Sequence, residues 1–216
     1  MRRPTETLEE AEKDAADEDW RGRQIRRPAE TLITVKTTKE DMDSFHDLVI
    51  HRRSIRKYTG ELLDPDQVRM ILEAGLMAPA GKRRNPWHFV VVDDPETLQK
   101  LSETRPMGTA QIAKCALAIV LCANPAESDT WIEDLSIASI QMQLQCTDLG
   151  LGSVWCQMRG RENADGVPAP YVVRQLLGIP DEYEVLNIIA IGHIGEERKP
   201  YDTAKLQREK VHVEKW

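Results

Sequence analysis

This chain has no excess of positive charge, few aromatic side chains and no long apolar run. Lysine and arginine number 29 against 36 acidic residues, which gives a formal net charge of −7. General nucleic-acid binders present a cationic face to phosphates, so this balance argues against that class. No apolar run approaches the roughly 18–20 residues that cross a bilayer, and the N-terminus lacks the apolar stretch of a signal peptide. We therefore expect a cytoplasmic protein without membrane or nucleic-acid partners.

Cysteines and nucleotide-binding motifs are also few. Cys115, Cys122, Cys146 and Cys156 form no C-x-x-C pair, and no histidine stands at metal-ligand spacing from them, so we predict no metal site. The first three lie among apolar residues and are interpreted as structural thiols. The chain has no G-x-G-x-x-G motif after a strand and no P-loop. Residues 150–152, G-L-G, are interpreted as a helix stop and not as a phosphate-binding loop. We find no Ser-His-Asp arrangement and predict no catalytic acid or base.

The chain divides into two parts. Residues 1–41 hold few large apolar side chains, so they cannot bury enough surface to offset the entropy lost on ordering. They are interpreted as a flexible or partly extended arm, as the product of an upstream start codon, or as an arm that embraces a partner subunit. Residues 42–216 read as one domain with its own core.

Residues 42–216 show clear helix and strand signals. Helices and strands mix without strict β-α-β alternation, which predicts an α+β fold with a mixed sheet. The predicted helix at 129–149 carries apolar residues on nearly every side, so we expect a partner subunit to cover its second face. Predicted helices are 45–51, one from 64–65 to before Pro79, 96–103, 129–149 and 171–177; predicted strands are 87–92, 116–123, 153–157 and 185–192.

The first candidate binding stretch is residues 51–58, H-R-R-S-I-R-K-Y. Arginine presents a planar fork of donors that suits a phosphate or carboxylate, and Ser54 adds a hydroxyl. A solvated basic corner at a helix C-terminus is the alternative interpretation. The second stretch is residues 78–87, A-P-A-G-K-R-R-N-P-W, which leaves a helix and enters a strand. Such a loop either lets a ligand approach the backbone or simply connects two elements.

Four motifs in order resemble the nitroreductase flavoproteins. They are R-R-S-[IV]-R-x-[YF] at residues 52–58, A-P-[SA]-x-x-x-x-x-P-W at 78–87, G-L-G-S at 150–153 and R-K-P at 198–200. The resemblance covers residues 42–216. It implies a mostly antiparallel sheet flanked by helices, in an interlocked homodimer with FMN held between the subunits. It also implies ping-pong hydride transfer from NADH or NADPH to a flat electrophilic small-molecule acceptor, such as a nitroaromatic compound or a quinone.

The resemblance also assigns residues to the cofactor. It implies that Arg52, Arg53, Ser54 and Arg56 line the FMN. Arg52 and Ser54 are expected on the phosphate and ribityl side, and Arg56 near the N1/C2 edge of the ring. Arg198 matches a second phosphate-binding arginine. Two further segments match positions that contact the flavin: one is contributed by the other subunit, and one presents its backbone to the N5/O4 edge. These segments are Pro79, Ala80 and Gly81 from the other subunit, and Cys156, Gln157 and Met158 from the end of a strand.

Several positions depart from the family pattern. Ala80 replaces a common serine, which leaves backbone contact only, and Asn85 replaces a common glutamine. Glu196 stands where some members have lysine, so we expect a weaker phosphate clamp on that side. Lys82 and Arg83 add charge near the predicted site; they either bind an anionic substrate or nicotinamide phosphate, or are simply solvated.

The sequence leaves three alternative functions to be considered. A non-catalytic flavin-binding sensor or storage protein would share the cofactor but not the reaction. Dehalogenating members of the fold carry a long helical lid, and residues 93–115 are too short to hold that lid in addition to a helix. Flavin-fragmenting members share the first motif, and no residue decides between them and a reductase.

Overall fold

The computed structural model describes residues 44–216, so the predicted arm at 1–41, together with Met42, lies outside the described residues. Every helix and strand predicted beyond the arm is present, with ends shifted by one or two residues. In chain order, the described elements are α2 (Phe45–His51), α3 (Pro65–Leu76), η2 (Gly81–Arg83), β1 (Trp87–Val92), α4 (Pro95–Ser102), η3 (Ala110–Lys114), β2 (Leu117–Ala123), α5 (Trp131–Asp148), β3 (Leu151–Gln157), α6 (Ala169–Leu177), β4 (Glu184–His193), η4 (Thr203–Lys205) and η5 (Arg208–Lys210).

The four strands form one sheet in the order β1-β2-β4-β3, and all three pairings are antiparallel. β2 and β4 occupy the centre because their side chains are apolar on both faces, and every residue of β2 is buried. β3 is an edge strand. On its outer edge, Ser153 forms an isolated parallel bridge with Ser54.

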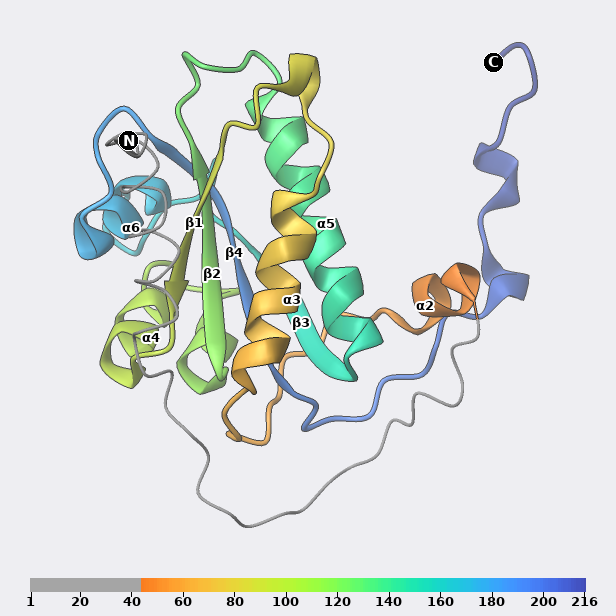
Figure 1. Cartoon of the computed structure of the whole chain (residues 1–216), viewed down its shortest axis with the longest axis horizontal. Coiled ribbons are helices and arrows are strands. Elements are labelled where there is room, and N and C mark those ends of the chain that lie inside the picture. The colour runs from red at the N-terminus through yellow and green to blue at the C-terminus, as the bar shows by residue number, and fades with distance from the viewer. Residues whose placement is uncertain (1–43) are drawn as a thin grey trace, which may run out of the picture.

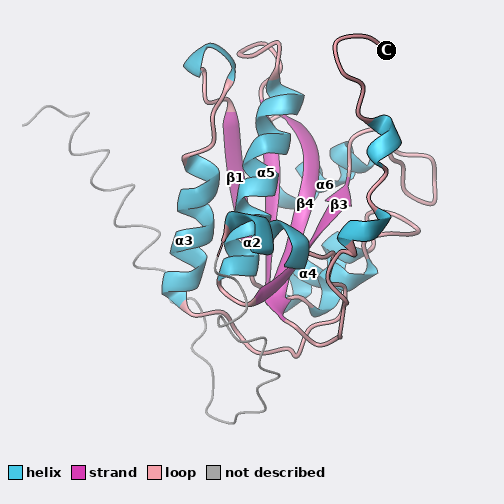
Figure 2. Cartoon of the chain, turned by 90° about the vertical axis from the view of Figure 1, so that its right-hand side faces the viewer, coloured by secondary structure: helices cyan, strands magenta, loops and turns pink. Residues whose placement is uncertain are grey.

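Helices cover both faces of this sheet, which confirms the predicted α+β class. α3 and α5 lie side by side on one face, whereas α4 and α6 cover the other (Figures 1 and 2). Ile71 and Leu135 are buried in the first core, and Leu101 and Val173 in the second. Burial of apolar area on both faces of the central strands is the dominant stabilising term.

Local capping explains where the helices begin and end. Asp64 caps α3: its side chain accepts from the Asp66 N–H at 2.8 Å, and Gln67 accepts from the Asp64 N–H at 3.0 Å. This reciprocal pair is the capping box that the sequence D-P-D-Q permits. Ser44 caps α2, and its hydroxyl oxygen accepts from the Asp47 N–H at 3.2 Å. Gly150, with φ of 71°, ends the turn after α5. Leu151 and Gly152 already belong to β3, so they are not part of the helix stop.

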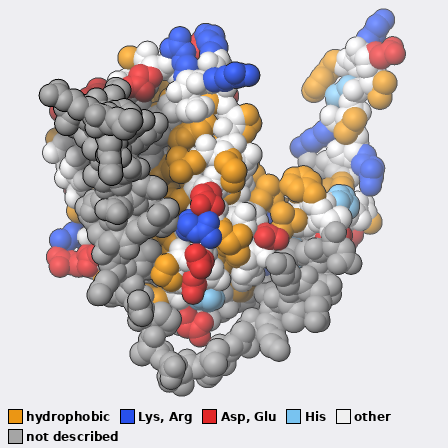
Figure 3. All heavy atoms as spheres, viewed as in Figure 1, with side chains coloured by type: hydrophobic (Ala, Val, Ile, Leu, Met, Phe, Trp, Pro, Cys, Tyr) orange, Lys and Arg blue, Asp and Glu red, His pale blue; other side chains and the backbone are white. Residues whose placement is uncertain are grey.

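The single chain covers only part of the surface of α5, and the sequence analysis expected a partner subunit to cover the remaining face. Ile137 and Ile140 are 37% and 40% exposed. Phe45 and Val49 of α2 are exposed as well, at 71% and 42%. Figure 3 shows hydrophobic side chains over the α3–α5 face and toward α2. Apolar residues on nearly every side of α5 therefore do not give burial on every side within one chain.

The C-terminal segment leaves the body of the molecule after β4. It runs past α2 and projects outward through η4 and η5 (Figure 1). Trp216 at its end is fully exposed. No helix among residues 44–216 is both long and apolar enough to span a membrane.

Candidate functional site

The basic segment at residues 52–58 runs from α2 to the open edge of the sheet. The Ile55 N–H donates to the Ser153 carbonyl at 3.0 Å, and the Thr59 N–H donates to the His193 carbonyl at 3.1 Å. The segment is therefore fixed against the start of β3 and the end of β4. The arginines of the first motif consequently lie beside an edge strand rather than on an isolated turn.

Residues 194–201 bring the last predicted arginine to the same place. The Gly195 N–H donates to the Lys57 carbonyl at 2.9 Å, and the Tyr201 N–H donates to the Ile50 carbonyl at 3.0 Å. A Cβ at Gly195 would lie 2.8 Å from the Tyr58 carbonyl carbon, so the close approach requires glycine. The two basic segments, predicted from motifs about 140 residues apart in the chain, thus run side by side.

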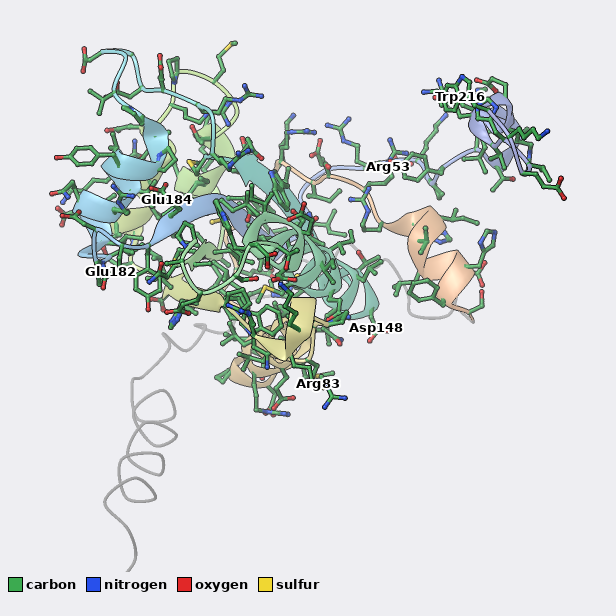
Figure 4. All side chains as sticks on the ribbon, turned by 90° about the horizontal axis from the view of Figure 1, so that it is seen from above. Arg53, Arg83, Asp148, Glu182, Glu184 and Trp216 are labelled. Carbon is green, nitrogen blue, oxygen red and sulfur yellow. The ribbon has the colours of Figure 1, made fainter. Side chains whose placement is uncertain are left out.

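Arg53 holds the C-terminal segment in position. Its guanidinium donates to the Lys199 carbonyl and lies over the Tyr201 ring, 4.5 Å from the ring centre. Figure 4 shows Arg53 between the body and the outward C-terminal segment. Arg52 reaches the Tyr201 hydroxyl only at 3.5 Å, a long contact that leaves its donors available. A flavin contact for Arg53 remains a prediction, and its observed partners are protein groups.

Glu196 lies within this basic cluster. One carboxylate oxygen accepts from the Arg56 N–H at 2.6 Å, and the other pairs with the Arg198 guanidinium at 2.9 Å. Burial raises the pKa of the Glu196 carboxyl, but the Arg56 N–H and the Arg198 charge outweigh it and leave the pKa below its ordinary value. A carboxylate therefore already occupies part of the Arg198 donor fork.

The open edge of β3 continues the site. The Ser153 carbonyl points to this edge, and backbone groups alternate along a strand, so those of Trp155 and Gln157 point the same way. Their N–H groups are the unpaired row of an edge strand. From Ser153 to Gln157 the strand rises about 13 Å.

The end of β3 is held rigidly. The Trp155 indole N–H donates to the Gln157 side-chain oxygen at 2.8 Å, and the Gln157 amide donates to the Arg159 carbonyl at 2.8 Å. The Arg105 guanidinium donates to the Gln157 carbonyl. Burial, followed by the Arg161 charge, lowers the pKa of Arg105. Arg105 therefore fixes the backbone carbonyl at this end of the strand.

The thiols are packing groups. Cys156 is 1% exposed and Met158 is fully buried, so neither side chain is accessible. Burial raises the pKa of Cys156 to about 11, although a hydrogen bond from Gln111 and the charges of Arg105 and Arg56 oppose it. Burial raises the pKa of the other three cysteines as well, which supports the structural interpretation of Cys115, Cys122 and Cys146.

The second candidate loop is anchored to the start of α5. The Gly81 N–H donates to Asp134 Oδ1 at 2.8 Å, and Asp134 is only 2% exposed. The Ser128 and Thr130 hydroxyls donate to Asp134 Oδ2 at 3.0 and 3.1 Å. A Cβ at Gly81 would lie 2.3 Å from the Thr130 hydroxyl oxygen, so the loop fits only glycine there. Asp134 thus fixes the backbone of residues 79–81.

The remainder of this loop is conformationally strained. Lys82, Arg83 and Asn85 have φ of 54°, 57° and 47°, a region that favours glycine. Lys82 pairs with Asp129 at 3.2 Å and Arg84 donates to a backbone carbonyl, so both cations are engaged. Figure 4 shows Arg83 far from Arg53. Within one chain, the loop and the basic cluster therefore do not meet.

Two residues of this arrangement were not predicted from the sequence. Arg105 lies in a loop with no motif, and its partner carbonyl is 52 residues away. Asp134 lies four residues after Thr130 near a helix start, a pattern that suggests local capping but not a bond to Gly81. No group of three or more potential metal ligands occurs among residues 44–216.

This fold, a four-stranded antiparallel sheet between helices, is shared with a solved FMN-dependent nitroreductase. The chain belongs to the Nitroreductase family, whose sequence model matches residues 49–108 and 111–193. This confirms the resemblance drawn from the four motifs. Three similar proteins illustrate the relationship.

A relative from Archaeoglobus fulgidus, named "Putative NADH dehydrogenase/NAD(P)H nitroreductase", is 33% identical over 180 residues, which is 81% of this chain and 100% of the relative. A Thermus thermophilus "NADH dehydrogenase" is 27% identical over 188 residues, 74% of this chain and 91% of the relative. The structure of an FMN-dependent nitroreductase from Clostridium difficile R20291 is 42% identical, with a TM-score of 0.76. It aligns with 78% of this chain and 98% of its own.

Proposed function

We propose that this chain is an FMN-dependent oxidoreductase that works as a homodimer. NADH or NADPH donates the hydride, and a flat electrophile such as a nitroaromatic compound or a quinone accepts the electrons in a ping-pong cycle. The observation that supports the proposal is that the segment carrying Arg52 and Arg56 runs beside the segment carrying Arg198 at the open edge of β3, with Glu196 bound to both. In this proposal residues 42–216 are the flavin-binding domain.

The donor groups at this edge fit FMN. Arg52, Ser54 and Arg198 would hold the phosphate and the ribityl hydroxyls, since guanidinium groups bind phosphate through paired donors. The edge N–H groups of Trp155 and Gln157 would meet the polar rim of the ring. The bound FMN supplies the redox chemistry, accepting a hydride from the nucleotide and reducing the acceptor.

The protein's own groups would bind the flavin and tune its charge. Arg56 adds positive charge at the ring side, where it would stabilise the negative charge that the ring gains on reduction. Arg105 fixes the Gln157 carbonyl and keeps the strand end in one conformation. No side chain is assigned as a proton donor.

A second copy of the chain would complete the site. Pro79, Ala80 and Gly81 lie far from the basic cluster of their own chain and would line the flavin of the partner. The exposed side chains of Ile137 and Ile140 offer the apolar surface that such a partner would cover. Sedimentation equilibrium is expected to give twice the chain mass of 24.6 kDa.

Anaerobic stopped-flow mixing tests the activity. The flavin absorbance of the FMN-loaded protein is expected to fall on mixing with NADH or NADPH and to return when a quinone or nitroaromatic compound is added. A flavin that stays oxidised for minutes would instead identify a non-catalytic flavin-binding protein. A protein that stays colourless after incubation with FMN would overturn both functions.

A further inference from the structure

A hollow of about 700 Å³ lies between the loop after β3 and the start of α6, and we call it the β3–α6 hollow. Arg159, Arg161, Glu162, Tyr171 and Arg174 line it. Its volume is within the range of small-molecule sites, roughly 300–1,000 Å³. It opens two residues beyond Gln157 along the chain, and nothing in the site described above uses it.

The loop that borders the hollow is held in one conformation. Asn163 Oδ1 accepts from the N–H groups of Asp165 and Val167, each at 2.9 Å. The Ala169 N–H donates to the Arg161 carbonyl at 2.8 Å, and Glu162 pairs with Pro168 in an isolated bridge. The loop is therefore closed by hydrogen bonds across its base, and this fixes the backbone from which Arg161 projects.

Two arginines of the hollow have free donor forks. Arg174 is engaged, because it donates to the Tyr183 carbonyl and to Glu184 Oε1, both at 2.9 Å. Arg161 donates only to the adjacent Gly160 carbonyl, at a long 3.4 Å. Arg159 approaches the Trp131 ring, at 6.0 Å from its centre. Neither Arg159 nor Arg161 has an ion pair with any carboxylate among residues 44–216.

Most other arginines near the flavin site are committed to protein partners. Arg53 binds a carbonyl and a ring, Arg105 binds a carbonyl, and Arg198 pairs with Glu196. The chain itself connects the hollow to the end of β3: the Gln157 side-chain amide donates to the Arg159 carbonyl at 2.8 Å, and Arg161 follows two residues later. The free cations of the hollow are thus next to the strand end at which the flavin ring is proposed to lie.

We infer that the β3–α6 hollow binds the adenosine diphosphate half of the nicotinamide donor. Arg159 and Arg161 bind the phosphates, and Tyr171, which is 46% exposed, offers its ring to the adenine. Glu162 is an acceptor for a ribose hydroxyl. This inference rests on the proposed function, because it supplies the part of the donor that does not react.

Substrate truncation tests the inference. Reduced nicotinamide mononucleotide carries the reacting ring but lacks the adenosine half of NADH. For Arg161→Gln and Arg159→Gln, the rate constant of flavin reduction at low NADH is expected to fall about tenfold. Reduction by the mononucleotide is expected to be unchanged. Equal losses with both donors, or no loss with NADH, would overturn the inference. Lys114→Gln, which removes an exposed cation elsewhere, should change neither rate.

ADP separates this inference from the proposed function. We expect isothermal calorimetry to show ADP binding to the FMN-loaded protein and about tenfold weaker binding to Arg161→Gln. ADP binding without flavin reduction would contradict the oxidoreductase proposal but support the hollow as an adenosine site. Flavin reduction with no ADP binding would overturn the hollow and leave the oxidoreductase proposal intact.

Discussion

Replacement of Glu196 by glutamine should strengthen FMN binding. In the free chain, the Glu196 carboxylate pairs with Arg198 at 2.9 Å and so competes with a phosphate for the same guanidinium. A phosphate on the other side of that guanidinium would lie about 5 Å from the carboxylate. Two like charges at that distance in a water-like medium repel by about 1 kcal/mol. The substitution removes this repulsion and keeps an oxygen that can accept from the Arg56 N–H.

The expected result is a dissociation constant for FMN about five to ten times lower than that of the wild type. Titration of the flavin-free protein with FMN, followed by quenching of flavin fluorescence, measures it. The difference should shrink at 1 M salt, because the repulsion is screened. Glu197→Gln, which changes net charge equally at an exposed neighbour, should have a smaller effect. Unchanged or weaker binding by Glu196→Gln would refute the competition.

Three further perturbations test the fold around the site. Asp134→Ala should lower the free energy of unfolding by about 3 kcal/mol, because three donors, the buried Ser128 hydroxyl and the part-buried Gly81 N–H and Thr130 hydroxyl, lose their acceptor, and should speed tryptic cleavage after Lys82; an effect below about 0.5 kcal/mol in urea would contradict this. Gly195→Ala should weaken FMN binding at least tenfold, since its Cβ would meet the Tyr58 carbonyl and part the two basic segments; wild-type affinity would show that the contact is unimportant. The buried thiols should make stability fall above pH 9: unfolded cysteines ionise near 9.0, whereas folded Cys122 stays protonated to about 11, so each thiol removes about 1.4 kcal/mol per pH unit. Urea titrations at pH 8 and 10 measure the loss, and Cys122→Ser should show a correspondingly smaller one.

The elements of the fold could be predicted because their local signals agree with the packing. The apolar run that becomes β2 is compatible only with burial on both faces, and Asp64 with Pro65 marks the start of α3. The strand order could not be predicted in this way, since several antiparallel orders bury the same faces. The exposed side chains of Ile137 and Ile140 on α5 are apolar, but the pattern does not show which chain covers them.

The candidate site, like the fold, could be predicted from the sequence only in part. The arginines of residues 52–56 and Arg198 were predicted from motifs. Their relative position depends on the register between two segments that are distant in the chain. Asp134 and Arg105 could not be predicted, because their partners, Gly81 and Gln157, are 53 and 52 residues away in the chain. Contacts of this kind arise from tertiary packing, and residue type alone does not reveal them.

The central claim is that this chain recognises the phosphate of its flavin through Arg52 and Arg198. Riboflavin has the same ring and ribityl chain as FMN but no phosphate, so parallel fluorescence titrations with the two flavins isolate that interaction. Two charge-assisted contacts predict that FMN binds at least about 100-fold more tightly than riboflavin. Equal affinity for the two flavins would contradict the account.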